Sequence, residues 1–190
     1  PYNRSDRVQW TLEELSLPYT YRVLDVFALE HRQSEFRERY GLARLPFMDI
    51  DGEVIFESGA IMLYLSQHFR ERADLVPEQS DPAYVKVLQW LFFAVSTLES
   101  TDPDRHPGDD PAPSASRAAT LAFLESELAD RDYIAAGRFT VADIALANGL
   151  KWFGADALDD YPNLGAYFSR HTSRPAFRKI AEQPEYRGRG

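Results

Sequence analysis

The spacing of apolar residues near the start of the chain predicts an amphipathic helix. The residues that recur at the intervals of one helical face are Val8, Thr11, Leu12 and Leu15. Asp6 stands just ahead of them, and an acidic side chain in the first turn interacts favourably with the helix dipole. Because proline disfavours helical backbone in the residue before it, we expect the helix to end at Pro18.

The pattern then changes twice. Tyr19–Val26 is rich in β-branched and aromatic residues, which predicts a buried strand. Ser34–Tyr40 is short and polar, and Gly41 follows it, so this stretch predicts a short helix with glycine at its C-terminal end. A helix, a strand and a second helix are therefore expected to open the chain.

A β-hairpin and a third helix are predicted next. The strands Pro46–Asp51 and Glu53–Phe56 are joined by Asp51-Gly52, and Asp-Gly between alternating apolar residues is a strong hairpin signal. We expect Ser58 to cap the helix that follows. The inner stripe of that helix consists of Ile61, Tyr64, Leu65 and Phe69.

The second half of the chain is predicted to be helical. Residues Glu71–Pro82 carry charge, two prolines and no periodicity, which is typical of a linker between domains. We therefore expect one domain over residues 1–72 and a second over residues 80–190. Beyond the linker the strand signal disappears. The expected helices are Ala83–Leu98, Ser116–Ala129, Thr140–Phe153 and Asn163–His171.

Composition narrows the functions that this pattern could serve. The 190 residues are 44% hydrophobic and 27% charged, the balance of a chain that folds around a core. The formal net charge of -9 repels nucleic-acid phosphates, so we expect small-molecule ligands and no nucleic acid. The sequence contains no cysteine, which excludes a protein thiol nucleophile within it. Its apolar stretches are shorter than the roughly 20 residues of a membrane span, so we expect a soluble, cytoplasmic protein with no membrane partner.

Two short motifs carry candidate chemistry. Pro46 opens a strand and removes one ladder hydrogen bond, so it belongs at an edge or after a cis peptide bond. The main chain of Leu45 would then be free to pair with a peptide-like ligand. Ser58 at a helix N-terminus favours a carboxylate, and Glu57 beside it favours an ammonium group, which together describe a site for an amino-acid head group. The alternatives are that Ser58 is only a cap beside a solvated Glu57 and that Pro46 is an ordinary strand-end proline.

Several segments resemble the cytosolic glutathione S-transferase family, in the family's order and over nearly the whole chain. They are Arg7–Leu15, Leu45-Pro46, Glu57–Ile61, Tyr64-Leu65, Phe139–Ile144, Tyr161-Pro162 and Arg174–Phe177. The resemblance, which is to bacterial-type members, implies the family's fold: an α+β thioredoxin-like domain followed by an all-α helical bundle. It also implies that the family's first strand is missing upstream of Pro1.

The resemblance further implies glutathione as a bound co-substrate and no metal. The cysteinyl part of glutathione would pair with the main chain of Leu45 beside a cis Pro46, and Glu57 and Ser58 would hold the γ-glutamyl end. The loop Tyr40–Pro46 differs from the family's usual sequence, so the group that holds the glycine end stays open. The candidates are His31, Arg32 and Arg44, each of which is otherwise a solvated surface charge.

Thr140 and Asp143 resemble the family's capping box in the helical domain. They are spaced so that each side chain can reach the backbone amide of the other. This pair is structural, and Thr140→Ala should cost about 1 kcal/mol of stability.

Transferase chemistry requires a stabilised thiolate, since a thiol with a pKa of about 8.5 is mostly protonated at neutral pH. A hydrogen-bond donor just ahead of the first helix would stabilise the anion, helped by the helix N-terminus. Asn3 stands where related sequences commonly have a hydroxyl and is the first candidate, with Ser5 second and Tyr2 third. The alternative for Asn3 is a simple cap or turn role.

A second, electrophilic substrate would lie between the two domains. Candidate wall residues are Trp90, Phe93, Trp152 and Phe153, although most aromatic residues at helical spacing belong to the core. The leading hypothesis is a homodimeric glutathione transferase of the detoxification type, in which the bound thiolate attacks a small electrophile. The alternatives are a non-catalytic, partner-binding or regulatory protein with the same fold, and a glutathione-dependent isomerase or dehalogenase.

Overall fold

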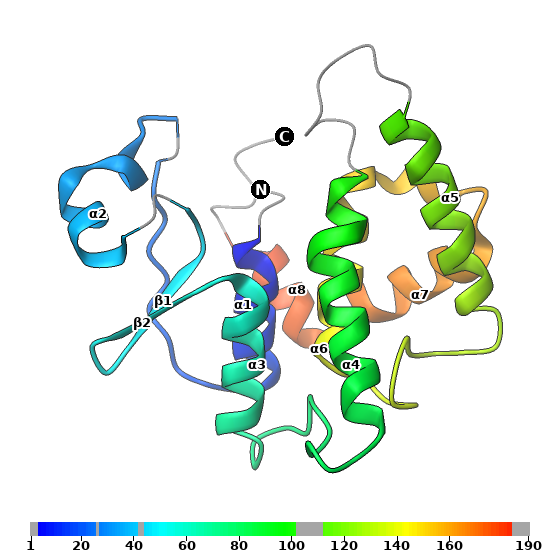
Figure 1. Cartoon of the computed structure of the whole chain (residues 1–190), viewed down its shortest axis with the longest axis horizontal. Helices are drawn as coiled ribbons and strands as arrows, with labels where there is room; N and C mark the ends of the chain where they lie inside the picture. Colours follow the sequence, from blue (N-terminus) through cyan, green and yellow to red (C-terminus); the bar gives the residue numbers. More distant parts are fainter. Residues whose placement is uncertain (1–3, 26, 42–43, 102–111, 184–190) are drawn as a thin grey trace.

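The computed structural model describes residues 4–25, 27–41, 44–101 and 112–183, which form two regions (Figure 1). The first region combines a short hairpin with helices, and the second region is helical. This is the expected arrangement of a thioredoxin-like domain followed by a helical bundle. The elements of the first region are α1 (Ser5–Glu14), η1 (Glu30–Arg32), α2 (Ser34–Tyr40), β1 (Phe47–Ile50), β2 (Glu53–Phe56) and α3 (Ser58–His68).

Local signals in the first region are confirmed at its turns. Asp51 and Gly52 have φ values of 52° and 90°, the left-handed backbone that a two-residue hairpin turn of type I′ requires. Helix α2 ends at Gly41, whose φ is 70°. Helix α1 ends at Glu14, and Ser16 turns the chain with a φ of 52° before Pro18 is reached.

The strand predicted over Tyr19–Val26 is wrong for the part of that range that the structure describes. Residues 19–25 form an irregular connection, and within the described ranges the sheet consists of β1 and β2 alone. A strand needs a neighbouring strand to complete its backbone hydrogen bonds, and neither β1 nor β2 pairs with this segment. Its apolar character serves packing instead, since Leu24 is 7% exposed. Val26 lies outside the described residues.

All four helices predicted for the second region are present. The C-terminal parts of two of them are not α-helical. Phe93–Leu98 forms a π-helix, and Lys151–Phe153 forms a 3-10 helix. The short helix α8 was not predicted, because its seven residues are fewer than the window over which helical periodicity can be recognised. The elements are α4 (Ala83–Phe92), η2 (Phe93–Leu98), α5 (Ala112–Glu127), α6 (Val141–Leu150), η4 (Lys151–Phe153), η5 (Ala155–Leu158), α7 (Pro162–Thr172) and α8 (Pro175–Ala181).

The segment predicted as a linker, residues 71–82, contains no helix or strand but is packed against the bundle. Leu75 and Val76 are 4% and 0% exposed. The backbone N–H of Val141 donates to the carbonyl of Leu75 at 3.0 Å. The linker is therefore docked at the start of α6.

Helix α6 forms the centre of the helical region, and every one of its residues is buried. Its small residues let other helices approach closely. A Cβ added at Gly149 would lie 2.8 Å from Cδ2 of Leu98 in η2, so a larger residue there would require the Leu98 side chain to move.

Helix α1 lies between the two regions and contacts α3 on one side and α6 and α8 on the other (Figure 1). Trp10 is fully buried at this junction. Its ring centroid is 4.8 Å from that of Phe177 in α8 and 6.1 Å from that of Phe139. One helix thus contributes to the packing of both regions.

The capping box predicted at the start of α6 is confirmed. The backbone N–H of Thr140 donates to Oδ2 of Asp143 at 2.8 Å, and the hydroxyl of Thr140 accepts from the N–H of Ala142 at 3.3 Å. Asp143 also accepts from the N–H of Ile134 and from the hydroxyl of Tyr167, both at 2.9 Å. The box therefore joins α6, α7 and the loop before them.

Candidate ligand-binding site

The register of the hairpin brings the two predicted motifs to one end of the sheet. Phe47 pairs with Phe56, so Pro46 and Glu57 come next on the two strands, at the same end. The peptide bond between Leu45 and Pro46 is cis. Leu45 and Pro46 are half-buried and Glu57 is exposed. The two motifs thus lie at the same end of the hairpin.

Glu57 makes the turn between β2 and α3 with an uncommon backbone conformation. Its φ is 66° and its ψ is 113°. A positive φ at a residue with a side chain costs of the order of 1–3 kcal/mol and persists only where the surrounding structure determines it; such residues cluster at ligand sites. This conformation lets β2 end at Phe56 and α3 begin at Ser58 with one residue between them.

The prediction that Ser58 caps the helix is wrong. Glu57 is the N-cap residue, Ser58 is already the first helical residue, and no side chain caps this end of α3. The reason is the positive φ of Glu57. The chain turns into the helix at Glu57, so the helix begins at Ser58, one residue earlier than it would if Ser58 were the cap. The first helical hydrogen bond runs from Ile61 N–H to the Glu57 carbonyl at 3.0 Å. The amides of Ser58, Gly59 and Ala60 therefore have no acceptor within the helix.

These groups suit a zwitterionic ligand. Amides without a helical acceptor and the positive end of the helix dipole favour a carboxylate at the start of α3. The exposed carboxylate of Glu57, immediately before them, favours an ammonium group. The Ser58 hydroxyl, on a residue only 4% exposed, lies at the same helix end. An amino-acid head group carries both complementary charges.

The three candidates for holding the far end of a peptide ligand differ in exposure. Arg44 is exposed and immediately precedes Leu45 in the chain. His31 and Arg32 lie in η1, where Arg32 is exposed and His31 is half-buried. The Nδ1 atom of His31 is buried without a hydrogen-bond partner. No described hydrogen bond or ion pair joins any of the three to the two motifs.

Of the candidates for thiol activation, the structure describes Ser5 alone, while Tyr2 and Asn3 lie outside the described residues. Ser5 is the first residue of α1 and is half-buried. Its position at the start of the helix places it beside the amides of the first turn, which lack helical acceptors. Because of this position, Ser5 stays a candidate for stabilising the thiolate.

A buried group of charges around the first turn of α1 was not predicted. Arg7 is fully buried and its Nη2 forms an ion pair with Oε1 of Glu99, the residue that follows η2. Arg4, the N-cap residue of α1, donates from Nε to Oε2 of Glu99 at 2.8 Å. Oδ2 of Asp6 lies 2.9 Å from Nζ of Lys151 in η4. We call these five residues the α1 charge cluster.

Burial dominates the electrostatics of this cluster. Burial lowers the pKa of Arg7, and the nearby carboxylate of Glu99 acts in the opposite direction. A signal for the cluster was available, because Arg7 lies four residues before Thr11 on the stripe that α1 buries. Its partner could not be predicted in the same way, since 92 residues separate Arg7 from Glu99.

Comparison with known proteins decides the family. Residues 3–73 match the model of the glutathione S-transferase N-terminal domain. Residues 111–175 match the model of the glutathione S-transferase C-terminal domain. The chain belongs to the glutathione S-transferase family.

Individual relatives match over almost the full chain. Glutathione S-transferase GstB of Escherichia coli strain K12 is 29% identical over 203 residues, which cover 94% of this chain and 92% of that protein. Glutathione S-transferase hmp2 of Hypomyces subiculosus is 25% identical over 197 residues and 93% of each chain. A solved sphingomonad glutathione S-transferase, complexed with glutathione, matches with a TM-score of 0.84 at 26% identity, over 94% of this chain and 93% of that one.

Within this glutathione S-transferase fold, two of the candidate wall residues belong to the core. Trp90 is 5% exposed, and its ring centroid lies 5.2 Å from that of Phe93 and 5.9 Å from that of Phe123. Phe153 is 8% exposed. Trp152 is half-buried, and the guanidinium carbons of Arg4 and Arg7 each lie 6.0 Å from its ring centroid. Trp152 therefore belongs beside the α1 charge cluster.

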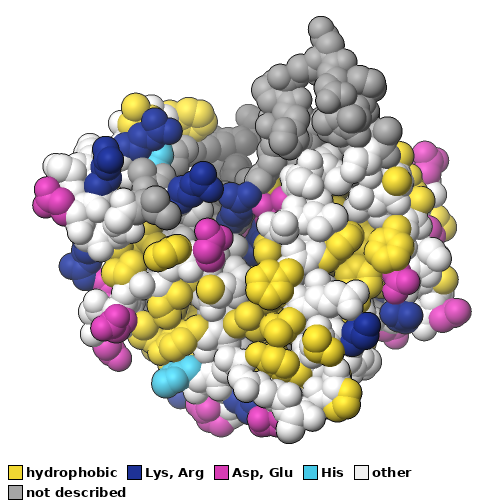
Figure 2. Space-filling view, viewed as in Figure 1, with side chains coloured by type: hydrophobic (Ala, Val, Ile, Leu, Met, Phe, Trp, Pro, Cys, Tyr) yellow, Lys and Arg dark blue, Asp and Glu magenta, His cyan; other side chains and the backbone are white. Residues whose placement is uncertain are grey.

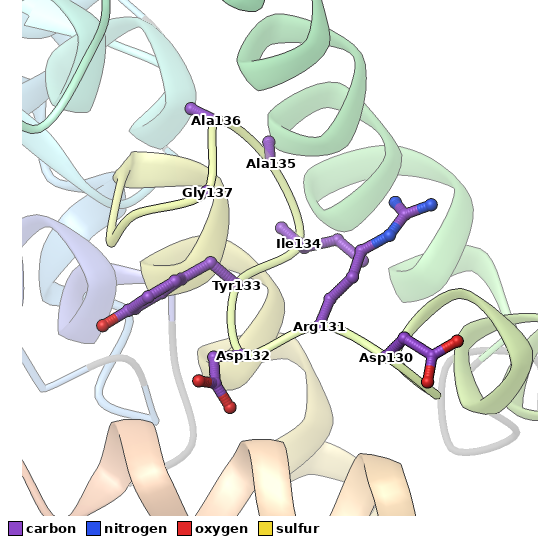
Figure 3. Close-up of a pocket in the computed structure, with 8 residues that line it drawn as sticks. All are labelled: Asp130, Arg131, Asp132, Tyr133, Ile134, Ala135, Ala136 and Gly137. Atoms are coloured by element: carbon purple, nitrogen blue, oxygen red, sulfur yellow. The ribbon is translucent and has the colours of Figure 1, made fainter.

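A hollow in the helical region lies away from the hairpin. It is lined by residues 130–137, in the loop between α5 and α6 (Figure 3). The side chains of Asp130, Arg131 and Tyr133 point in different directions rather than toward one centre (Figure 3). The hollow thus lacks the convergent polar groups of a ligand site.

The described part of the chain contains neither a membrane-spanning helix nor a metal-binding cluster. No helix there is long and apolar enough to cross a membrane. No cluster of three or more His, Asp or Glu side chains there has an arrangement that could hold a metal ion.

Proposed function

We propose that this chain binds glutathione at the end of the hairpin and promotes attack of the glutathione thiolate on a small electrophile. One observation supports the proposal: the hairpin register brings Leu45-Pro46 and the start of α3 at Glu57 to the same end of the sheet. The choice of ligand is supported by the family and by the relative that was solved in complex with glutathione.

Each part of glutathione has a complementary group at this end of the hairpin. The ammonium of the γ-glutamyl residue pairs with the Glu57 carboxylate, and its carboxylate accepts from the amides of α3 and the Ser58 hydroxyl. The cysteinyl amide and carbonyl pair with the main chain of Leu45, as an added strand would. The glycine carboxylate goes to a cation, for which Arg44 is the nearest in sequence and His31 and Arg32 are the others.

The thiol of the bound cysteinyl residue loses its proton to solvent and is held as a thiolate near the start of α1. Asn3, Ser5 or Tyr2 donates a hydrogen bond to the sulfur, in that order of preference. The thiolate attacks an electrophilic carbon of the second substrate, a carbon–sulfur bond forms, and the leaving group departs with its electron pair. No metal takes part in this step.

We further propose that the chain acts as a homodimer through the face that carries α3 and α4. Figure 2 shows hydrophobic side chains gathered over these helices. Val85 and Phe92 of α4 are 62% and 58% exposed, and Phe56, just before α3, is 51% exposed. Contiguous exposed apolar surface is typical of protein interfaces. Phe92→Asp should shift the sedimentation coefficient to that of a monomer, whereas a wild-type protein that sediments as a monomer would contradict the dimer.

The decisive experiment for the proposed function is a titration of the protein with glutathione. Calorimetry measures binding, and the thiolate absorbance of the bound ligand, followed as the pH is lowered, measures the pKa of its thiol. We expect binding with a thiol pKa below that of free glutathione, and we expect Asn3→Ala to reduce this shift. Absence of binding at millimolar glutathione would instead favour a non-catalytic module.

A variant at Glu57 tests the head-group contact directly. Glu57→Gln removes the negative charge but keeps a similar shape, so the dissociation constant for glutathione should rise roughly 10- to 100-fold, as expected for loss of one charged hydrogen bond. Glu53→Gln is the matched control, because Glu53 is also exposed but begins β2, at the opposite end of the strand. Equal affinities of the two variants would contradict the assignment of Glu57.

A further inference from the structure

Helix α1 is joined to the helical region by ion pairs at both of its ends. At the N-terminal end, Glu99 bridges Arg4 and Arg7. At the C-terminal end, Glu14 accepts two hydrogen bonds from Arg174, each of 2.7 Å, in a bidentate pair. Both ends of α1 are thus held by arginine–carboxylate ion pairs. Only the N-terminal end carries the first-turn amides that could act on a bound thiolate.

The N-terminal contact depends on one carboxylate. The Nε and Nη1 atoms of Arg7 are buried without hydrogen-bond partners, so the charge of Arg7 is balanced at close range by Glu99. The side chain of Glu99 is 2% exposed and that of Arg7 is 0% exposed. A buried charge without its partner is strongly unfavourable. The side chain of Glu99 therefore restricts where Arg7 can lie.

The bridge fixes an orientation as well as a distance. Arg4 and Arg7 lie three residues apart, on one side of the first helical turn, and they bind different oxygens of the same carboxylate. Asp6, between them in sequence, pairs with Lys151. Because both partners come from the helical region, that region helps to set the direction in which the first turn points.

We propose that Glu99 is a positioning residue for thiolate formation: by holding Arg4 and Arg7, it aims the N-terminal turn of α1 at the sulfur of bound glutathione. The inference rests on the proposed function. The field of a helix N-terminus falls off within its first turn, and displacements of about 1 Å are enough to weaken catalysis strongly. The helical region thereby contributes to activation of a ligand that the thioredoxin-like region binds.

The test uses Glu99→Gln in the full chain. Glutathione affinity should stay within about threefold of wild type, because the groups that bind the head group lie at the hairpin. The pKa of the bound thiol should rise by about one unit, so that about tenfold less thiolate is present below both pKa values. With a chlorodinitrobenzene as electrophile, kcat at a pH below both values should fall about as much, while KM for glutathione changes little.

Glu14→Gln is the matched control. It weakens the ion pair at the other end of α1 and leaves the first turn untouched, so it should lower stability without raising the pKa of the bound thiol. A merely structural role for Glu99 predicts the same behaviour for both variants. If Glu99→Gln does not fold, Glu99→Asp replaces it, because it keeps the negative charge beside Arg7 but shortens the side chain that holds Arg4 and Arg7.

The outcomes separate the two proposals. Wild-type protein that binds no glutathione overturns the proposed function and this inference together. Wild-type protein that binds glutathione with a lowered thiol pKa, combined with a folded Glu99→Gln or Glu99→Asp variant that keeps the same pKa, overturns the positioning role alone. A raised thiol pKa in the variant, with the control unchanged, supports it.

Discussion

Two acidic side chains, one in each region of the chain, have opposite surroundings. In the helical region, Asp143 is fully buried and accepts four hydrogen bonds, from the Thr140 amide and hydroxyl, the Ile134 amide and the Tyr167 hydroxyl. In the thioredoxin-like region, Glu57 is exposed beside helix amides that have no acceptor within the helix.

The difference shows which polar groups serve folding and which are left for a ligand. A buried carboxylate whose oxygens are saturated with donors has no capacity for a further partner, and its removal leaves those donors unsatisfied. An exposed carboxylate contributes little to the stability of the fold and is accessible to a ligand. Substitutions in the two regions should therefore separate stability from affinity.

The largest expected effect is that of Asp143→Ala. It takes the acceptor away from two buried amides and two buried hydroxyls, so the free energy of unfolding should fall by roughly 3–5 kcal/mol. Urea unfolding followed by circular dichroism measures this change. The folded fraction should still bind glutathione with wild-type affinity. A loss below about 1 kcal/mol would mean that the network contributes little to folding.

A pH titration of stability should report His171, which packs against Asp143 and Tyr167. Burial lowers the pKa of His171 from 6.5 to about 4. A group with a lowered pKa contributes stability that is present above pH 6.5 and lost as the pH falls through 4. Burial raises the pKa of Asp143 from 3.8 to about 6, so its contribution is present below pH 3.8 and lost as the pH rises through 6.

Between pH 4 and pH 6.5, the contributions of His171 and Asp143 to stability therefore change in opposite directions. Removing His171 leaves the contribution of Asp143 to be measured alone. His171→Phe keeps a ring in contact with Tyr167 but cannot take a proton. The stability difference between wild type and this variant should shrink by up to about 3 kcal/mol as the pH falls from 7 to 4. A difference that stays constant over this range would show that His171 does not titrate differently in the folded state.

A smaller effect is expected for Thr140→Ala. The change removes the hydroxyl that accepts from the Ala142 amide and leaves the Asp143 carboxylate in place, so the free energy of unfolding should fall by about 1 kcal/mol. Thr20→Ala is the control, since Thr20 is exposed in an irregular segment. Thermal unfolding should rank the control near wild type. Equal losses for the two variants would argue against a specific capping contribution.

The smallest effect on stability is expected for Ser58→Ala, because the Ser58 side chain makes no capping hydrogen bond. The free energy of unfolding should change by less than about 0.5 kcal/mol, while the dissociation constant for glutathione rises several-fold through loss of one hydrogen bond. Ser126→Ala, at an exposed helical position, controls for the helix propensity of alanine. A large loss of stability with unchanged affinity for glutathione would show that Ser58 serves folding and not ligand binding.

Much of the fold could be predicted because its signals lie within a few residues of one another. The turn at Asp51-Gly52, the end of α2 at Gly41 and the box at Thr140 each depend on local backbone preferences and short-range hydrogen bonds. The predicted strand over Tyr19–Val26 was wrong because a strand forms only beside a partner strand. The composition of one segment does not show whether a partner lies next to it. The role of Ser58 was misjudged because nothing in the side-chain pattern reveals the positive φ of Glu57.

Most of the order of the elements, the division into a mixed and a helical region, and the positions of the motifs that carry the family resemblance could be read from the amino-acid sequence alone. These follow from periodicity and turn chemistry, which act over one or two helical turns. Only the tertiary structure decided that Arg7 is balanced by Glu99 and that Trp90 belongs to the core. Burial and charge pairing depend on which distant segments meet, and that choice is made by the packing of the whole chain.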